Sequence, residues 1–208
     1  MRKMINFRIT LLSCILGISC LTISIRAHAA MYSPIAVSLI PPVQLPPSTF
    51  GVSGVRLSLL WGHNRHVYGL DVGGLGNITT VQFGGTAISG LFNITHGVTD
   101  ILGVQLAGLA NYNTESTFVL GAQLTLGLNI NTAGSSIYGI DVGLLGNYTP
   151  HTKVHGVQFG LYNNSRSIYG LQIGLLNRTA NLHGIQIGLL NFNTKGMFEI
   201  SPLLNIGF

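Results

Sequence analysis

The sequence predicts an all-β protein, an antiparallel outer-membrane-type β-barrel of about 10–12 strands built from repeats of 14–18 residues. Three observations support this fold class. A short alternating motif recurs along the chain, the last segment reads as an amphipathic strand, and the N-terminus has the parts of an export signal. Apolar residues make up 47% of the chain and charged residues only 7%, a balance that suits contact with lipid.

Residues 1–30 are predicted to be a secretory signal peptide. A basic start precedes an apolar run over 9–25 and a small-residue stretch, so cleavage is expected after Ala29 or Ala30. An uncleaved N-terminal membrane anchor is the alternative, because the apolar run is nearly long enough to cross a bilayer as a helix.

The exported chain is nearly neutral and free of cysteine. Cys14 and Cys20 both lie in the signal segment, where lipidation of either is a second alternative. Beyond residue 30 there are six Lys and Arg against five Asp and Glu, a net charge of +1. No basic patch for nucleic acid is present. We expect a proline-rich lead-in with a candidate first strand over 31–50 and a repeat β domain over 51–208.

The repeat is most regular near the C-terminus. Gly-Leu-Gln-Ile-Gly-Leu-Leu-Asn at 170–177 recurs with one change at 184–191, and related copies begin at Gly139 and Gly156. The closing asparagines are separated by 14 to 18 residues. Similarity at so short a period indicates a repeated structural unit before it indicates a function. The predicted structural repeat positions are Gly139, Asp141, Gly143, Asn147, Gly156, Gln158, Gly160, Asn163, Gly170, Gln172, Gly174, Asn177, Gly184, Gln186, Gly188 and Asn191.

Each copy is predicted to be one extended strand. Ile185, Ile187 and Leu189 share one face, which would meet lipid or core, and positions 184, 186 and 188 (Gly, Gln, Gly) share the other. A membrane helix is the rival, but the apolar runs are far shorter than the roughly 20 residues it needs. The repeated Asn is expected to mark the point where each strand turns.

Two β architectures fit such strands. A parallel β-solenoid would stack equal coils, and its repeated Asn would form an internal ladder; a barrel would join antiparallel strands through short turns. The repeat length drifts from 18 to 14 residues, which a barrel can absorb in its turns. The barrel is therefore the main prediction and the solenoid the alternative.

Two further features favour the barrel. The segment 198–208 alternates between apolar and polar residues and ends at Phe208, which is predicted to act as an assembly signal for the outer membrane. Tyrosines precede the repeat Gly at 68, 138 and 169, and aromatic residues follow the repeat Asn at 112, 148 and 192. Rings at strand ends are expected to form interfacial girdles, the alternative being rings that cap a solenoid core.

Several segments share a pattern known from one protein family. They are the proline-rich 41–47, Val55–Gly62, Tyr68–Val72, the Gly-Leu-Gln-Ile-Gly-Leu-Leu-Asn copies and the ending Pro202–Phe208. With these segments the chain resembles the bacterial surface-repeat proteins described in leptospires and found in other Gram-negative bacteria. The resemblance covers about residues 37–208 and implies an exported protein of the outer membrane or cell surface, with no catalytic residues to carry over.

The sequence predicts no catalytic, cofactor-binding or metal-binding residues. His63 and His66 are interpreted as polar loop residues, because no helical His-Glu-x-x-His motif or cysteine accompanies them. Asp71 and Asp141 replace the Gln of other copies and are expected at interior positions, facing Arg56 or another donor.

The predicted function is therefore that of an exported outer-membrane or cell-surface protein with a structural or surface-interaction role and without catalytic activity. Its expected partners are outer-membrane lipid and a surface ligand that the sequence does not identify, with no nucleic acid. A surface-attached β-solenoid that binds a partner is the alternative, and a small outer-membrane channel is the third hypothesis.

Overall fold

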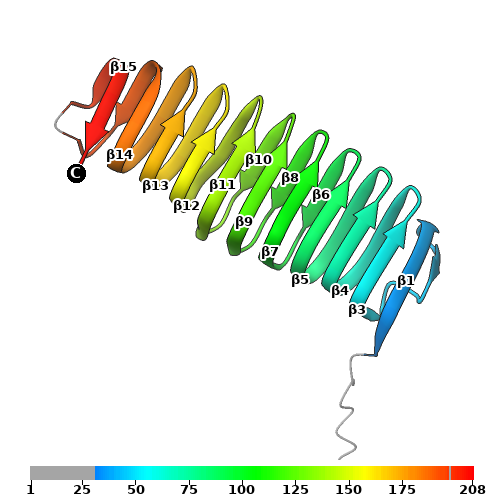
Figure 1. Cartoon of the computed structure of the whole chain (residues 1–208). Helices are drawn as coiled ribbons and strands as arrows, with labels where there is room; N and C mark the ends of the chain where they lie inside the picture. Colours follow the sequence, from blue (N-terminus) through cyan, green and yellow to red (C-terminus); the bar gives the residue numbers. More distant parts are fainter. Residues whose placement is uncertain (1–30, 197) are drawn as a thin grey trace, which may run out of the picture. The chain divides into compact units, whose positions relative to one another are not determined.

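The computed structural model describes residues 31–196 and 198–208, and this part of the chain folds into β-strands and turns (Figure 1). The predicted signal peptide, with Cys14 and Cys20, lies outside the described residues. The strands in chain order are β1 (Tyr32–Ile40), β2 (Val43–Leu45), β3 (Gly51–Ser58), β4 (Trp61–Gly73), β5 (Gly76–Ser89), β6 (Phe92–Thr95), β7 (Val98–Ala107), β8 (Ala110–Asn113), β9 (Thr117–Thr125), β10 (Leu128–Asn131), β11 (Ser135–Gly143), β12 (Gly146–Phe159), β13 (Tyr162–Ile173), β14 (Leu176–Asn193) and β15 (Ile200–Gly207).

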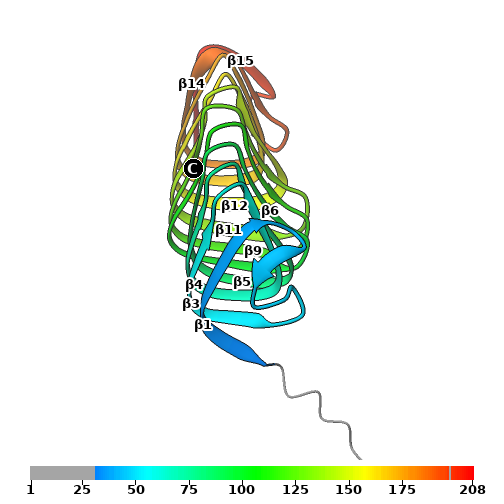
Figure 2. The same cartoon turned by 90° about the vertical axis from the view of Figure 1, so that its right-hand side faces the viewer.

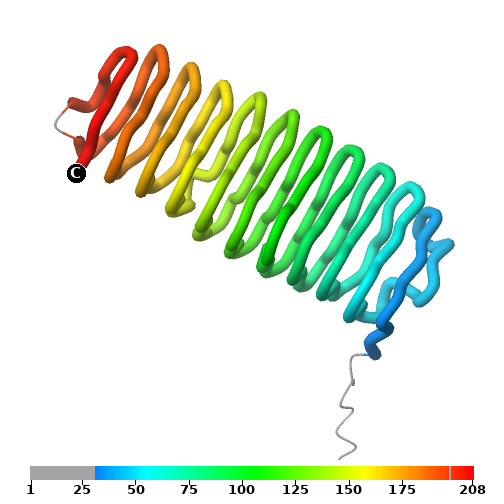
Figure 3. The backbone as a smooth tube through the Cα atoms, viewed as in Figure 1, coloured from blue at the N-terminus to red at the C-terminus, as the bar shows by residue number. Residues whose placement is uncertain are grey.

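The strands form a parallel β-solenoid, so the predicted barrel is wrong and the alternative fold is the one observed. From β3 to β14 every strand pairing is parallel, and residues one repeat apart lie side by side. Figures 1 and 3 show that successive coils have similar shapes and stack one after another along a common axis. Alternation alone does not separate the two folds, because side chains alternate with period two in parallel and antiparallel strands alike.

Each coil contributes to two facing sheets. The first sheet holds the Gly-x-Gln segments and consists of β3, β7, β9, β11 and the later parts of β4, β5, β12, β13 and β14. The second sheet holds the repeat Asn and consists of β6, β8, β10 and the earlier parts of those five long strands. Seen along the axis, the coils are elongated closed loops (Figure 2).

The repeat Asn lies within a strand and not at a turn, contrary to the sequence-based expectation. Asn93, for example, is the second residue of β6, paired with Asn77 and Asn111 on its two sides. The tight turn comes earlier, at exposed leucines. We call this turn the leucine edge; it comprises Leu59, Leu75, Leu91, Leu109, Leu126, Leu144, Leu161, Leu175 and Leu189.

The opposite turn absorbs part of the drift in repeat length. We call it the polar edge; it comprises 96–97, 114–116, 132–134, 150–152 and the equivalent positions around 166, 180 and 194. In β12 the register shifts between Thr149 and Lys153, while the paired segment of β13 needs only Ser165 to Ser167. Between β5 and β7 the register instead shifts inside the first sheet, between Gly85 and Ala87. The solenoid thus accommodates unequal coils both at the polar edge and by a local irregularity within a sheet.

Both ends of the stack carry an antiparallel strand. β2 pairs with β1 at the N-terminal end, and β15 pairs with β14 at the C-terminal end. Segment 31–50, expected as a lead-in, therefore forms β1 and β2. Within the described residues, no helix has the length and apolar character needed to span a membrane.

Candidate functional site

The interior of the coils is mainly polar. Among the described residues, 35 polar or charged side chains are buried, against 12 apolar ones. Most of the apolar ones form one column, since each coil contributes a side chain at the same position of its first-sheet strand. This column consists of Val52, Val67, Phe83, Ile101, Val119, Ile137, Val154, Ile168 and Leu182. The rest of the interior is organised by hydrogen bonds between coils.

The repeat asparagines form a continuous ladder inside the second sheet. Each side chain from Asn77 to Asn177 donates its Nδ2 amide to Oδ1 of the next asparagine, over 2.8 to 3.0 Å. All of these residues are buried. The ladder includes the predicted positions Asn147, Asn163, Asn177 and Asn191.

The repeat glutamines form a second ladder inside the first sheet, with the opposite direction. Gln186 donates to Gln172 and Gln172 donates to Gln158, each over 2.7 Å. Gln158 then donates to Oδ2 of Asp141 over 3.0 Å. Because donors point toward the N-terminus here and toward the C-terminus in the asparagine ladder, the dipoles of the two ladders oppose each other.

Asp141 interrupts the glutamine ladder with a buried carboxyl group. Its partners are the neutral amides of Gln158 and of Asn129, the latter at 2.9 Å. Burial raises the pKa of Asp141 to about 7, although both amides stabilise the charged form and oppose that shift.

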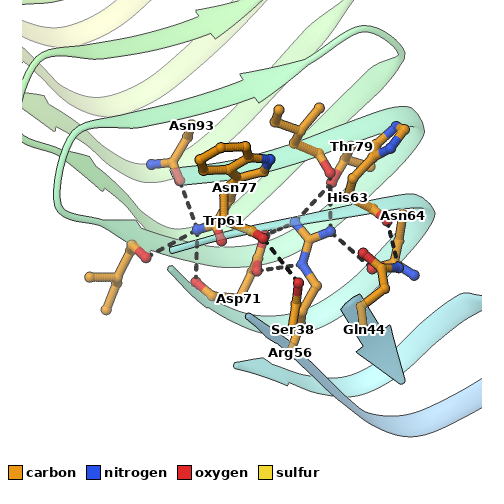
Figure 4. A network of polar contacts seen from close by, with 12 residues as sticks. Ser38, Gln44, Arg56, Trp61, His63, Asn64, Asp71, Asn77, Thr79 and Asn93 are labelled. Carbon is orange, nitrogen blue, oxygen red and sulfur yellow. Dashed lines mark hydrogen bonds and ion pairs between the residues drawn. The ribbon is translucent and has the colours of Figure 1, made fainter. Parts of the chain in front are cut away.

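Arg56 and Asp71 form a buried ion pair in the N-terminal coils (Figure 4). The sequence predicted an interior position for Asp71 that faces Arg56 or another donor, and Arg56 is the donor observed. Arg56 donates from Nε and Nη2 to the two carboxylate oxygens of Asp71, over 2.7 and 2.6 Å. The guanidinium also donates to Oδ1 of Asn64 and to the carbonyl of Ile78. Burial raises the pKa of Asp71, and the positive charge of Arg56 opposes that rise. Both side chains are closed off from solvent, so this pair is interpreted as structural.

The repeat glycines are required by close contact between coils. At Gly170 the backbone has a positive φ of 138°, and an added Cβ would collide with the carbonyl oxygen of Gly156. At Gly174, before the leucine edge, an added Cβ would collide with the carbonyl oxygen of Gly160. The same two roles apply to other predicted glycines, Gly139, Gly156 and Gly184 in the first case and Gly160 and Gly188 in the second. A Cβ on Gly143 would instead collide with the carbonyl oxygen of Gly146 in the same coil.

The outer surface is apolar along one face and one edge. Between the repeat Gly and the repeat Asn, the outward positions of the described coils carry no charged residue. Leu109 and Leu126 on the leucine edge expose 61% and 69% of their surface. A contiguous row of exposed apolar side chains marks an interaction surface. Exposed members on the first sheet are Leu57, Leu70, Ile88, Leu106, Ile140, Phe159, Ile185 and Ile187.

Aromatic side chains border this apolar surface on both sides. On the first sheet, just before the repeat Gly, Tyr138, His155, Tyr169 and His183 stack in successive coils, with ring centroids 4.5 to 4.6 Å apart. On the second sheet, Tyr112, Tyr148 and Phe192 directly follow the repeat Asn and point outward. The rings thus lie outside the solenoid and do not cap its core.

The charged side chains outside the interior lie away from the leucine edge. They are in or beside the polar edge, or in the loop before β15: Arg65, Asp100, Glu115, Lys153, Arg166, Arg178, Lys195 and Glu199. Sequence reasoning missed this separation. The signal was present in the repeats, because aligning them on the Gly and Asn positions places every one of these charges outside the Gly-to-Asn segments.

The other candidate groups do not converge on a reaction centre. In the described part of the chain, no three His, Cys, Asp or Glu side chains come close enough to share a metal ion. His63 and His66, interpreted from the sequence as loop residues, lie within β4. The pKa of His63 is lowered, mainly by burial and also by the nearby charge of Arg56. Phe208 lies beyond β15 with its ring fully exposed.

Comparison of the chain with protein-family models, with curated proteins and with solved structures finds no match. The functional argument therefore depends on the geometry alone. That geometry consists of a closed polar interior, a continuous apolar face with a leucine edge, flanking rings and a charged opposite edge.

Proposed function

We propose that this protein is an exported, non-catalytic β-solenoid of the bacterial cell envelope that attaches to a membrane surface with its leucine edge in the lipid. The observation that carries the proposal is the order of residue classes around the coils: leucines at one edge, aromatic rings of several coils at intermediate positions, and the charges that the coils carry on the side away from the leucines. The predicted signal peptide and the resemblance to surface-repeat proteins support an outer-membrane or cell-surface location.

The dimensions of a coil fit one leaflet of a bilayer. Tyr138 lies six residues before Leu144, which is about 20 Å along an extended strand. A leaflet measures about 20–22 Å from the bilayer centre to the outside of the headgroups. With Leu144 near the centre, Tyr138 would lie at the headgroup level, where Tyr and Trp are enriched in membrane proteins. The charged polar edge would then remain in water.

The backbone also suits this position. Lipid offers no hydrogen bonds, so a segment can enter it only when its N–H and C=O groups are bonded within the protein. In the solenoid these groups bond to the coils on either side, and most polar side chains of the interior are hydrogen-bonded within the protein. Between the repeat Gly and the repeat Asn, the outward side chains then presented to lipid are uncharged and mostly apolar.

The alternatives differ in what they require. A small channel would need an open lumen, whereas the interior is filled by the asparagine and glutamine ladders. A second copy of the chain could cover the same apolar face, and that outcome is separated from lipid binding by the experiment below.

The experiment is flotation of the purified chain from residue 31 onward, without the apolar signal segment, with phosphatidylcholine vesicles after detergent removal. We expect wild-type protein to float with the vesicles. The double variant L109D/L144D places two carboxylates on the leucine edge and should remain in the aqueous fraction, because a charged side chain in the hydrocarbon costs several kcal/mol.

The matched control is H96D/H151D, which places two carboxylates on the exposed polar edge. It should float like the wild type, and circular dichroism should show that both variants keep the β fold. Wild-type protein that stays in solution as a dimer, with or without vesicles, would overturn membrane attachment in favour of self-association. Equal flotation of the leucine-edge variant would overturn it as well.

A further inference from the structure

Arg166 and Arg178 lie together on the outer side of the second sheet, in adjacent coils near the C-terminal end. In the register of β13 and β14, Asn164 pairs with Arg178 and Ser165 pairs with Thr179, which places Arg166 just beyond Arg178 toward the polar edge. Both arginines are exposed and line one hollow of about 270 Å³. No carboxylate contributes to the lining of this hollow.

The two guanidinium groups have no acidic partner in the described part of the chain, where Arg56–Asp71 is the only ion pair. Arginine presents a planar fork of N–H donors that matches the oxygens of a phosphate group. Two such groups at one hollow, without a carboxylate to neutralise them, therefore form an anion-binding surface.

A second hollow of about 350 Å³ adjoins the first and shares Arg178 and Thr194 with it. Its other walls are mainly apolar, formed by Tyr162, Leu176 and Phe192. The two hollows together present cationic groups at one end and an apolar surface at the other. This arrangement is complementary to an amphiphile with an anionic head and a hydrocarbon chain.

The position of the arginines agrees with membrane attachment. Arg178 follows Leu176 by two residues, about 7 Å along the strand, and Arg166 is about 7 Å further from the leucine edge. A side chain at this height can extend its guanidinium to the headgroup layer while its methylene groups stay among the acyl chains.

We propose that Arg166 and Arg178 bind the phosphate headgroup of an anionic phospholipid, with its acyl chain against Tyr162, Leu176 and Phe192. This inference rests on the proposed membrane attachment and adds to it a specific lipid class. It makes the C-terminal coils the part of the solenoid that selects the membrane.

The test measures partition of the chain from residue 31 onward, without the basic and apolar signal segment, into vesicles of phosphatidylcholine with and without phosphatidylglycerol. Wild-type protein should partition more strongly into the anionic vesicles, and R166Q/R178Q should lose that gain, by roughly fivefold for each arginine. The variant should still bind the phosphatidylcholine vesicles like the wild type. The control R65Q/K153Q removes two exposed cations from other coils, with the same change in net charge, and should keep most of the gain.

Each result distinguishes the inference from the proposed function. Wild-type binding to both vesicles without an anionic gain would overturn the headgroup site and leave membrane attachment standing. Failure to bind either vesicle would overturn both. An equal loss in R65Q/K153Q would show a diffuse charge effect and overturn a site at the two arginines.

A second measurement separates a lipid headgroup from free phosphate. Thermal unfolding of the wild-type chain should shift upward with dodecyl phosphate below its micelle concentration, and the shift should be absent in R166Q/R178Q. Inorganic phosphate at the same concentration should give no shift, because it cannot use the apolar hollow. An equal shift with inorganic phosphate would overturn the assignment to a lipid.

Discussion

Nε2 of Gln158 lies 3.0 Å from Oδ2 of Asp141, and this contact joins a neutral amide to a buried carboxyl group. The carboxyl group stands in register with Gln123 in the preceding coil and Gln158 in the following one. Within the described residues its partners are amides, whereas the other buried aspartate of the ladder, Asp71, is paired with Arg56. Two residues at equivalent positions of the repeat are therefore held in different ways.

The first prediction concerns the pH dependence that Asp141 confers. The pKa of Asp141 is raised from 3.8 to about 7 in the folded chain. Between these two pH values the carboxyl group stays protonated in the folded state and is ionised in the unfolded state. The stabilising effect of the neutral form is complete below about pH 4. It then decreases as pH rises to about 7, by up to roughly 1.4 kcal/mol per pH unit, and is constant above that.

Urea unfolding between pH 4 and pH 8 measures this effect. In D141Q the ladder continues with an amide, so we expect the decrease to be clearly smaller, with the contribution of Asp71 remaining, and the variant to be more stable than wild type above pH 7. D100N removes one carboxylate from the outer surface and should keep the wild-type slope. An unchanged slope in D141Q would show that Asp141 is charged in the folded state throughout.

The second prediction concerns the ion pair. R56M leaves the buried carboxylate of Asp71 without its cation and should destabilise the fold by about 3–5 kcal/mol. R56M/D71N replaces both charges and should recover a large part of that loss. A double-mutant cycle on urea unfolding measures the coupling, and strictly additive effects of the two changes would contradict it.

The third prediction concerns Gly170, a repeat glycine in the first sheet. G170A should lower stability by about 1–3 kcal/mol, because the residue has a positive φ and its new Cβ would collide with the carbonyl oxygen of Gly156. G134A is the matched control, since no atom lies within 4 Å of the Cβ added there. Equal thermal midpoints for the two variants would show that neighbouring coils move apart easily.

Some of this architecture could be predicted from the sequence. The grouping of Ile185, Ile187 and Leu189 on one face and Gln186 on the other follows from the period of an extended strand, and the structure shows the first group exposed and Gln186 buried. An interior position for Asp71 facing Arg56 or another donor was also predictable, because a buried carboxylate without a compensating partner destabilises the fold.

The direction of pairing was not predictable in the same way. In a parallel solenoid and in an antiparallel barrel alike, Gln186 and Ile187 point to opposite faces of their strand. The two folds differ in which residue of the neighbouring strand pairs with Gln186. That neighbour is Gln172, and the amide contact between them joins residues 14 positions apart. The use of Gln and Asn as the interior also inverts the usual rule that apolar residues are inside, which is why composition indicated lipid-facing strands of a barrel.

The fourth prediction concerns the asparagine ladder. Asn147 accepts from Asn129 over 3.0 Å and donates to Asn163 over 2.8 Å, so it joins three successive coils. In N147A, Nδ2 of Asn129 loses this acceptor and Oδ1 of Asn163 loses this donor, and both atoms are buried. Each loss of this kind costs about 1–3 kcal/mol. Because coils of a solenoid contact only their neighbours, the effect should be local.

Hydrogen exchange of backbone amides measures this local effect. In N147A we expect faster exchange in β10, β12 and β13 around residues 129, 147 and 163, with little change in β3 and β4. N164A is the control, since Asn164 faces outward one residue after the ladder. It should exchange like the wild type. Uniformly faster exchange throughout the chain in N147A would contradict local coupling, because it would mean that the coils unfold as one cooperative unit.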